Sequence, residues 1–487
     1  MNKNSYRIIY SKARQMFVAV AENVRSQTKT SGQSEASSQN PINNETQAFH
    51  QLWQVKALVA SISLWMPLAP VYADIVADSA ANAANRAVIG AAKNSAGTVV
   101  PVVNIQTPKN GVSHNIYKQF DVLAEGAVLN NSRQGATTQT VGNVSANPFL
   151  ATGEARVILN EVNSSAASRF EGNLEVAGQM ADVIIANPSG INIKGGGFIN
   201  ANKAIFTTGK PQLNADGSIK QFTVDQGKIT VSANPNSKFG LGGNNNDANY
   251  IDLYARALEL SAELRAKNDI QVITGANDVS ADLESITTKT GTGSTPTLAV
   301  DVKALGGMYA NNIYLVGTEK GLGVSNAGTL EALNSLVVTS AGKIENTGAL
   351  YNKNPQNSLL SLSSDEGNDI VHTGTMITNG NLILDSGKDI IVDHARIEKH
   401  GADNKNIISL SAKNDINIKN SANIQNFGEG GDLYLDANNI NLGNDVNLGV
   451  NGSIFLQAEK NLQGDHVRNI SSMYDVNLYA GNLLSFN

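Results

Sequence analysis

Leu382-Ile-Leu-Asp-Ser-Gly-Lys-Asp-Ile390 is one of seven segments with a shared pattern in the C-terminal third of the chain. Each segment starts as apolar–x–apolar and continues with a small residue and a polar turn. The other six begin at Leu336, Leu360, Ile408, Leu433, Ile454 and Val476, so the spacing is 21–26 residues. Such a unit is too small to bury its own apolar face, and it must therefore stack on its neighbours.

This repeat predicts an all-β fold, a right-handed parallel β-helix with 21–26 residues per coil. Period-two alternation turns one face of each strand inward, and the Asn/Gly/Asp clusters bend the chain. We expect Asn side chains at the turns to stack as ladders. Leucine-rich repeats have a similar length, but their longer consensus is missing. A β-sandwich would not keep one spacing over seven units.

Exposed strand edges at the ends of such a rod need a cap. We expect an N-terminal cap in about 74–125, where the period is not visible. The C-terminal end at Asn487 shows no cap-like segment, so we expect either that the rod continues in a longer parent protein or that the chain is a truncated product. The expected domains are 1–73, a leader; 74–340, the first part of the helix with its cap; and 341–487, the repeat region.

Composition excludes several classes of site. The chain of 487 residues has no cysteine, which rules out disulfides and thiolate metal sites. The six histidines are scattered, so we expect no metal site and no cofactor: His50, His114, His372, His394, His400 and His466. No His-Glu-x-x-His, Gly-x-Ser-x-Gly or Walker motif is found, and we therefore predict no enzyme activity.

Residues 1–73 have the order of an extended secretory signal. A basic stretch over residues 1–30 is followed, after a polar insert, by a short apolar run over 57–71. Val71-Tyr72-Ala73 then supplies small residues for cleavage between Ala73 and Asp74. We expect this leader to be helical. Two alternatives are a membrane anchor, for which the run is short and interrupted by Pro67 and Pro70, and a basic helix that touches nucleic acid or membrane.

The charge balance after the leader argues against nucleic acid as a partner. Residues 1–73 hold seven basic and three acidic residues, which leaves 29 basic and 39 acidic residues and a net charge of about −10. Phosphate contacts need clustered Lys and Arg, and an acidic chain lacks them.

Several sequence segments after the leader carry a family resemblance. They include Asn104-Ile-Gln-Thr-Pro-Lys-Asn-Gly-Val-Ser-His-Asn-Ile-Tyr-Lys-Gln-Phe-Asp-Val122, Val128-Leu-Asn-Asn-Ser132, Ala155-Arg-Val-Ile-Leu-Asn-Glu-Val162 and Asn173-Leu-Glu-Val-Ala-Gly178. Together they resemble the secretion domain of the two-partner-secretion exoproteins, the filamentous-haemagglutinin-like family, over roughly 74–340. The extended signal agrees with this resemblance.

The resemblance implies an export route. The inner-membrane secretion machinery and signal peptidase would act on the leader. An outer-membrane β-barrel transporter with periplasmic recognition domains would then catch the unfolded chain, which would fold into the β-helix outside a Gram-negative cell. The protein would be secreted or held at the cell surface.

Two marker motifs of the family map onto this chain. They are Asn147-Pro148-Phe149-Leu150 and Asn187-Pro188-Ser189-Gly190-Ile191, in which Phe149 and Ser189 stand where the family usually has Asn or a similar polar residue. From the residues alone, Asn-Pro forms a turn and Gly190 supplies a positive φ before the next strand. The motifs are therefore expected to form turns, to contact the transporter, or to do both.

Two hypotheses of function remain open. The first is an exported haemagglutinin/adhesin-like protein whose rod binds a receptor on host or neighbouring cells. The second is the N-terminal part of a contact-dependent growth-inhibition toxin or haemolysin without its C-terminal effector. The Val-Glu-Asn-Asn word that usually precedes such an effector is absent, which favours the adhesin.

Overall fold

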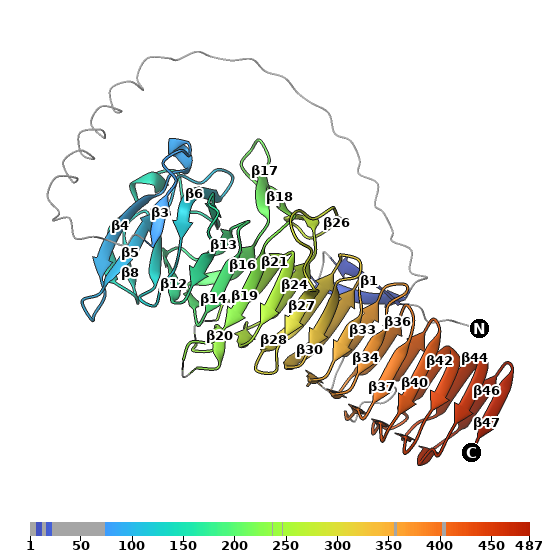
Figure 1. Cartoon of the computed structure of the whole chain (residues 1–487). Helices are drawn as coiled ribbons and strands as arrows, with labels where there is room; N and C mark the ends of the chain where they lie inside the picture. The colour runs from blue at the N-terminus through green and yellow to red at the C-terminus, as the bar shows by residue number, and fades with distance from the viewer. Residues whose placement is uncertain are drawn as a thin grey trace, which may run out of the picture. The chain divides into compact units, whose positions relative to one another are not determined.

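Most residues after position 74 wind into coils of three short strands, and corresponding strands of successive coils pair in parallel (Figure 1). This computed structural model describes residues 6–11, 16–21, 74–235, 237–245, 247–354, 358–401 and 406–487. The chain divides into two units, Met1–Ala73 and Asp74–Asn487. The expected all-β, right-handed parallel β-helix is confirmed for the second unit.

The first face of the helix is one continuous ladder of parallel strands. Its strands are β6 (Val112–Phe120), β10 (Val157–Val162), β13 (Ala181–Ala186), β16 (Ala201–Thr207), β21 (Tyr250–Ala255), β24 (Asp269–Thr274), β28 (Gly307–Gly317), β30 (Thr329–Ser340), β33 (Leu359–Ser364), β36 (Asn381–Ser386), β39 (Ile408–Ala412), β42 (Leu433–Leu442), β44 (Ile454–Gly464) and β46 (Val476–Ala480).

The second face shares the C-terminal parts of β42 and β44. Its other strands are β11 (Ser168–Phe170), β14 (Ile191–Lys194), β19 (Lys228–Ser232), β22 (Ala257–Leu260), β27 (Leu298–Val302), β29 (Gly323–Asn326), β31 (Ile344–Asn346), β34 (Ile370–His372), β37 (Ile390–Asp393), β40 (Asp415–Lys419) and β47 (Leu483–Phe486).

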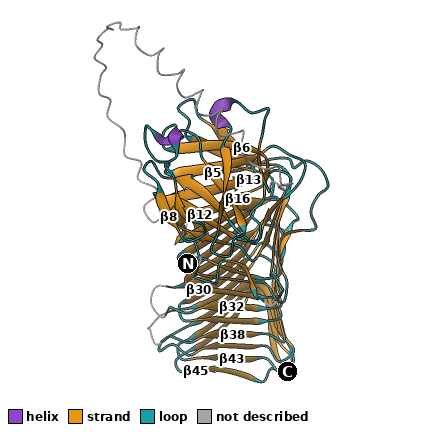
Figure 2. Ribbon diagram, turned by 90° about the vertical axis from the view of Figure 1, so that its left-hand side faces the viewer, coloured by secondary structure: helices purple, strands orange, loops and turns teal. Residues whose placement is uncertain are grey.

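The third face shares the N-terminal parts of β28 and β30. Its other strands are β5 (Val99–Asn104), β7 (Ala127–Asn131), β12 (Asn173–Gly178), β15 (Gly197–Ile199), β20 (Phe239–Leu241), β23 (Glu263–Arg265), β32 (Ala349–Asn352), β35 (Thr375–Thr378), β38 (Arg396–Lys399), β41 (Asn423–Asn426), β43 (Asn447–Val450) and β45 (Asn469–Ser472). Figure 2 shows these strands as stacked rungs.

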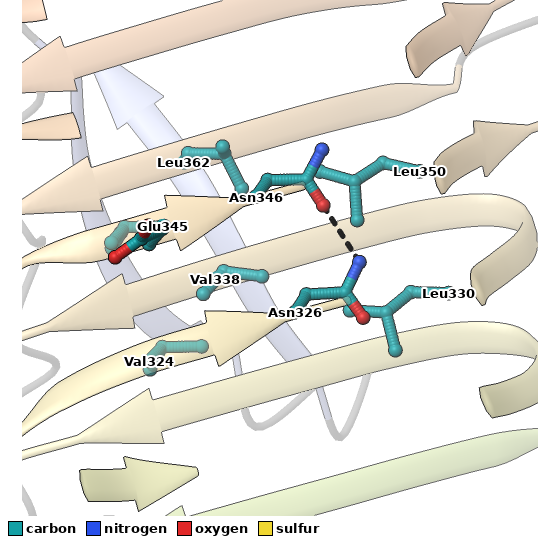
Figure 3. A pocket seen from close by; sticks show the side chains of 9 residues that line it. Val324, Asn326, Leu330, Val338, Glu345, Asn346, Leu350 and Leu362 are labelled. Carbon is teal, nitrogen blue, oxygen red and sulfur yellow. Dashed lines mark hydrogen bonds between the residues drawn. The ribbon is translucent and has the colours of Figure 1, made fainter. Parts of the chain in front are cut away.

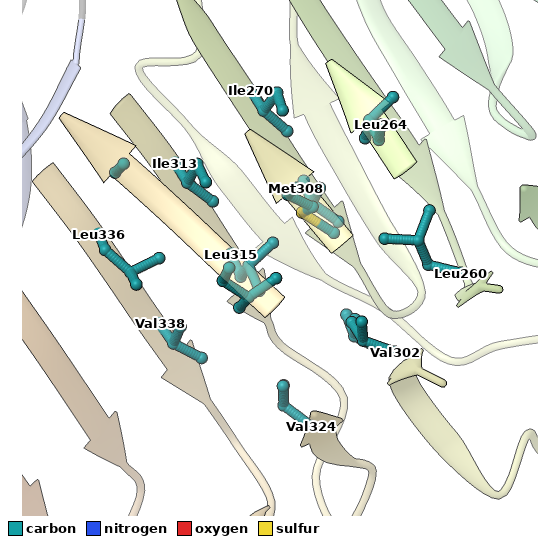
Figure 4. Packing of buried hydrophobic residues seen from close by; sticks show 14 of the residues in the cluster. Leu260, Leu264, Ile270, Val302, Met308, Ile313, Leu315, Val324, Leu336 and Val338 are labelled. Carbon is teal, nitrogen blue, oxygen red and sulfur yellow. The ribbon is translucent and has the colours of Figure 1, made fainter. Parts of the chain in front are cut away.

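The repeat seen in the sequence is the register of the first face. The first residues of the seven segments are successive Cα partners: Leu336, Leu360, Leu382, Ile408, Leu433, Ile454 and Val476. From Leu336 to Ile454 they are 0% exposed. Aliphatic side chains fill the interior between the three faces (Figure 4), so each coil buries its apolar residues against the next one.

An N-terminal cap covers the first coil, as expected. β3 (Ile75–Ala77) pairs antiparallel with β6, and β4 (Val88–Lys93) pairs antiparallel with β5. A 3-10 turn, η1 (Ala83–Asn85), lies between them in sequence. These antiparallel pairs occupy an edge that would otherwise be open to other strands.

One sheet outside the coils was not predicted. It is four-stranded and antiparallel, in the order β17 (Lys210–Leu213), β18 (Ile219–Val224), β25 (Asn277–Ser280) and β26 (Ile286–Thr288). It consists of two insertions, one after β16 and one after β24, which interrupt the period in this part of the sequence. A bidentate ion pair between Arg256 and Glu319 lies beside it, with Nη2–Oε1 at 2.7 Å and Nε–Oε2 at 3.0 Å.

That arginine joins the insertion to the rod, because its Nη1 donates to the carbonyl of Thr292 at 2.6 Å. The hydrogen bonds from Arg256 lower the pKa of Glu319. A short hairpin, β8 (Ala136–Thr138) with β9 (Gly142–Val144), is a second element outside the three faces.

The expected helical leader is wrong for its described residues. β1 (Tyr6–Ser11) and β2 (Met16–Ala21) pair antiparallel, with Tyr6 opposite Ala21. Both segments are rich in β-branched and aromatic residues, which favour strands. The apolar run 57–71 and Ala73 lie outside the described residues. In the described part of the chain, no helix has the length and hydropathy to cross a membrane.

Candidate functional site

The first marker motif forms a tight turn around a buried asparagine. Asn147 precedes the 3-10 turn η2 (Pro148–Leu150), and its Oδ1 accepts the N–H of Phe149 at 3.0 Å. Its Nδ2 donates to the carbonyls of Ile105 and Asn130, both at 2.9 Å. Asn147 is 2% exposed, so its amide joins the turn to two other segments of the N-terminal coils.

The second motif repeats this arrangement. Asn187 is 0% exposed, and its Oδ1 accepts the N–H of Ser189 at 2.9 Å. Its Nδ2 donates to the carbonyl of Ala166 and to Oγ of Ser168, both at 3.0 Å. Gly190 has a φ of 112°, in the region that favours glycine, and β14 begins directly afterwards at Ile191.

In both turns the asparagine side chain binds the backbone N–H two residues later, as an Asx turn does. The side chains of Phe149 and Ser189 are therefore not needed for this bond. Ser189 adds a bond of its own, because its Oγ donates to the carbonyl of Ser164 at 2.6 Å. Leu150 and Ile191 are buried in the core, whereas Pro148 is exposed.

A carboxylate that the sequence pattern does not single out holds the hairpin preceding the first motif. Glu175 is 4% exposed, and its two oxygens accept the N–H groups of Gln139 and Thr140, each at 2.8 Å. These two residues form the turn between β8 and β9. Glu175 lies in the segment 173–178, which was quoted above for its family resemblance, but only the fold shows what its carboxylate binds. The described residues contain no group of His, Asp and Glu placed to hold a metal ion.

The predicted cleavage position falls at the division between the two units. Asp74 is the first described residue of the β-helical unit, and its carbonyl accepts the N–H of Asp121 at 2.8 Å. Asp121 is itself 3% exposed and pairs with Arg169 at 2.9 Å. The first residue after the expected cleavage is thus bound to the first coils.

The family model of the TPS secretion domain matches residues 73–346, more than half of the chain. This protein belongs to the TPS secretion-domain family of two-partner-secretion exoproteins. The model of the extended signal peptide of the type V secretion system matches residues 1–43. The protein is therefore exported through the periplasm and the outer membrane and is secreted or held at the cell surface.

Curated relatives of this TPS protein are much longer. The toxin CdiA of Yersinia pestis is 38% identical over 384 residues, which are 78% of this chain and 11% of that protein. The 16S rRNA endonuclease CdiA of Enterobacter cloacae is 35% identical over 423 residues, 84% of this chain and 12% of that protein. The chain thus spans about a ninth of the length of the curated relatives it matches.

A solved structure is also similar. It is the crystal structure of the filamentous hemagglutinin secretion domain, 30% identical, with a TM-score of 0.47. The similarity covers 65% of this chain and 98% of that chain.

We predict that Asn187→Ala destabilises the β-helix by about 1–3 kcal/mol, because it removes the three hydrogen bonds of a buried amide, to the carbonyl of Ala166, Oγ of Ser168 and the N–H of Ser189. The measurement is urea unfolding of the secreted chain. Asn192→Ala is the matched control, since Asn192 is exposed on β14 and its Oδ1 accepts one bond from Thr230. Equal stability of the two variants would show that the buried amide contributes nothing beyond an exposed one.

Proposed function

We propose that the outer-membrane transporter recognises the segment containing both marker motifs before the chain folds, and that the β-helix then forms outside the cell. The observation that supports this is the burial of Asn147 and Asn187, at 2% and 0% exposure. Side chains so enclosed are accessible to a partner only while the surrounding coils are unfolded. The same two residues would then serve recognition first and the turns of the folded rod afterwards.

The other steps of the route belong to this proposal. The inner-membrane secretion machinery carries the leader across, and signal peptidase cleaves between Ala73 and Asp74. The secretion domain then occupies 74–340, and 341–487 is the repeat region that follows it. We propose no catalytic role and no cofactor for these residues.

For the activity of the exported protein we propose adhesion. The faces of the rod would bind a receptor on host or neighbouring cells. A β-helix supports this function because its strands hold outward side chains in regular rows.

The second candidate is the N-terminal carrier of a contact-dependent growth-inhibition toxin or haemolysin. The names of the curated relatives favour it, since they are called toxins and nucleases and this chain matches their sequence over about 11–12% of their length. On this hypothesis the rod delivers an effector encoded elsewhere in a longer protein.

We predict that Asn187→Ala reduces export through the transporter, because on this proposal the transporter contacts the Asn187 side chain in the unfolded chain. The full chain is expressed in a Gram-negative host with and without its candidate β-barrel transporter, and the secreted fraction is measured. Leu384→Ala is the matched control. Leu384 is 0% exposed on β36, and its loss costs about 2–5 kcal/mol of stability outside the motifs.

Three outcomes are informative. Reduced export of Asn187→Ala with normal export of Leu384→Ala supports recognition. An equal loss for both variants assigns the effect to folding alone. Normal export of both removes the recognition role of Asn187.

The two candidate activities predict different results in mixed cultures. If the protein is an adhesin, secreted chain binds neighbouring or host cells in a saturable manner, and cells that express it do not slow the growth of their neighbours. If it carries a toxin, neighbours stop growing when the gene is expressed together with any coding sequence in frame downstream, and a cognate immunity gene protects them. Absence of saturable binding would contradict adhesion.

A further inference from the structure

Three polar side chains stack inside the rod where aliphatic residues are the rule. Asn326 on β29, Asn346 on β31 and His372 on β34 are successive Cα partners on the second face. They are 3%, 1% and 0% exposed. The next residue in this column is Val392, so the polar column ends at the histidine.

The hydrogen bonds of this column run in one direction. Asn326 Nδ2 donates to Asn346 Oδ1 at 2.7 Å (Figure 3). Asn346 Nδ2 lies 3.0 Å from His372 Nδ1, and an amide nitrogen can only donate, so Nδ1 accepts. His372 Nε2 lies 3.4 Å from the carbonyl of Arg396, to which it donates. These bonds suit a neutral imidazole with its proton on Nε2.

The opposite end of the column is open. Asn326 Oδ1 is buried and has no hydrogen-bond partner. Asn326 and Asn346 both line a small cavity whose other walls include Leu330, Val338 and Leu350 (Figure 3). An amide at this end can turn over without breaking a bond to Oδ1.

A proton on Nδ1 would oppose this arrangement. It would face the N–H of Asn346 at 3.0 Å, and its remaining acceptor is the carbonyl of Asn346 at 3.3 Å. To accept from His372, the amides of Asn346 and then of Asn326 would have to turn over. Each amide would then lose the bond that its Nδ2 donates to the carbonyl two residues later, Gly328 O for Asn326 and Gly348 O for Asn346, both at 3.3 Å.

The charged side chains on the neighbouring strands are engaged elsewhere. Glu345 pairs with Lys343, Asp393 pairs with His394 and Lys419, and Arg396 pairs with Glu398. The buried Lys399 of β38 donates from Nζ to the carbonyl of Gly401. No carboxylate among the described residues pairs with His372 to stabilise its charged form. Burial accordingly lowers the pKa of His372 to about 4.

We propose that the column Asn326–Asn346–His372 is an acid-sensitive switch within the rod, in which protonation of His372 reverses the amide ladder and opens the coils from β29 to β37. The rest of the rod, in which none of the described histidines is fully buried, stays closed under the same conditions. The inference is independent of the proposed adhesion and export roles.

The direction follows from proton linkage. An unfolded histidine titrates near pH 6.5, so between that value and about pH 4 the unfolded state binds more protons than the folded state. The contribution of neutral His372 to the free energy of unfolding is fully present above about pH 6.5 and is lost as the pH falls toward 4. At pH 4.5 this favours opening on the order of 50–100-fold relative to neutral pH.

The test compares secreted wild-type chain with His372→Asn, which continues the ladder with an amide that does not titrate. His394→Asn is the matched control, because His394 is 71% exposed in its side chain. Urea unfolding is measured at pH 7.5 and pH 4.5. Between pH 7.5 and pH 4.5, we expect the unfolding equilibrium constants of the wild type and of His394→Asn to rise on the order of 50–100-fold more than that of His372→Asn.

Hydrogen exchange of the wild type provides a second readout that needs no variant. Protection factors, corrected for intrinsic exchange at each pH, should fall at pH 4.5 in β29, β31, β34 and β37 and hold in β39 to β44. The same acid response in His372→Asn as in the wild type, or a uniform loss of protection along the rod, would overturn the proposal.

Discussion

No coil of this protein can be stable alone, and every other feature depends on that constraint. A coil of 21–26 residues has three short strands, and most of the inward side chains on each strand are aliphatic. It satisfies its backbone and covers its apolar residues only by stacking on the coils before and after it. The N-terminal cap closes one end of this stack through antiparallel pairs, which gives the following coils a surface to build on.

The same constraint explains why the turns carry asparagine. A turn that must sit against its neighbours buries backbone groups, and each needs a partner. Asn147 and Asn187 supply one acceptor to their own turn and donors to other segments, so the motifs are complete only after stacking. Farther along, amide ladders such as Asn423–Asn447–Asn469 join coils on the surface. The proposed export as an unfolded chain, with folding outside the cell, agrees with this dependence.

The sequence periodicity predicts the part of the fold in which one strand per coil repeats regularly, the first face from β30 to β46. The seven segments that start at Leu336 to Val476 reveal the register because, within each segment, the residues pair one to one with those of the next segment. The sheet β17–β18–β25–β26 was not predicted, since its strands are insertions that break the period. The leader segments β1 and β2 show local strand preference where a signal helix was expected. For the site, the Asx turns follow from Asn-Pro chemistry, whereas the distant partners Ile105, Asn130 and Ala166 require the fold.

Cross-linking in this cysteine-free chain tests the stacked register most directly. Ser363 and Asp385 are Cα partners on adjacent coils, and Ser411 is the partner of Asp385 one coil farther on. At about 4.8 Å per coil, cysteines at 363 and 385 are within disulfide range, and cysteines at 363 and 411 are not. The account predicts that secreted Ser363→Cys/Asp385→Cys chain forms an internal disulfide on oxidation and that Ser363→Cys/Ser411→Cys chain does not. Equal cross-linking of both pairs, or of neither, would contradict it.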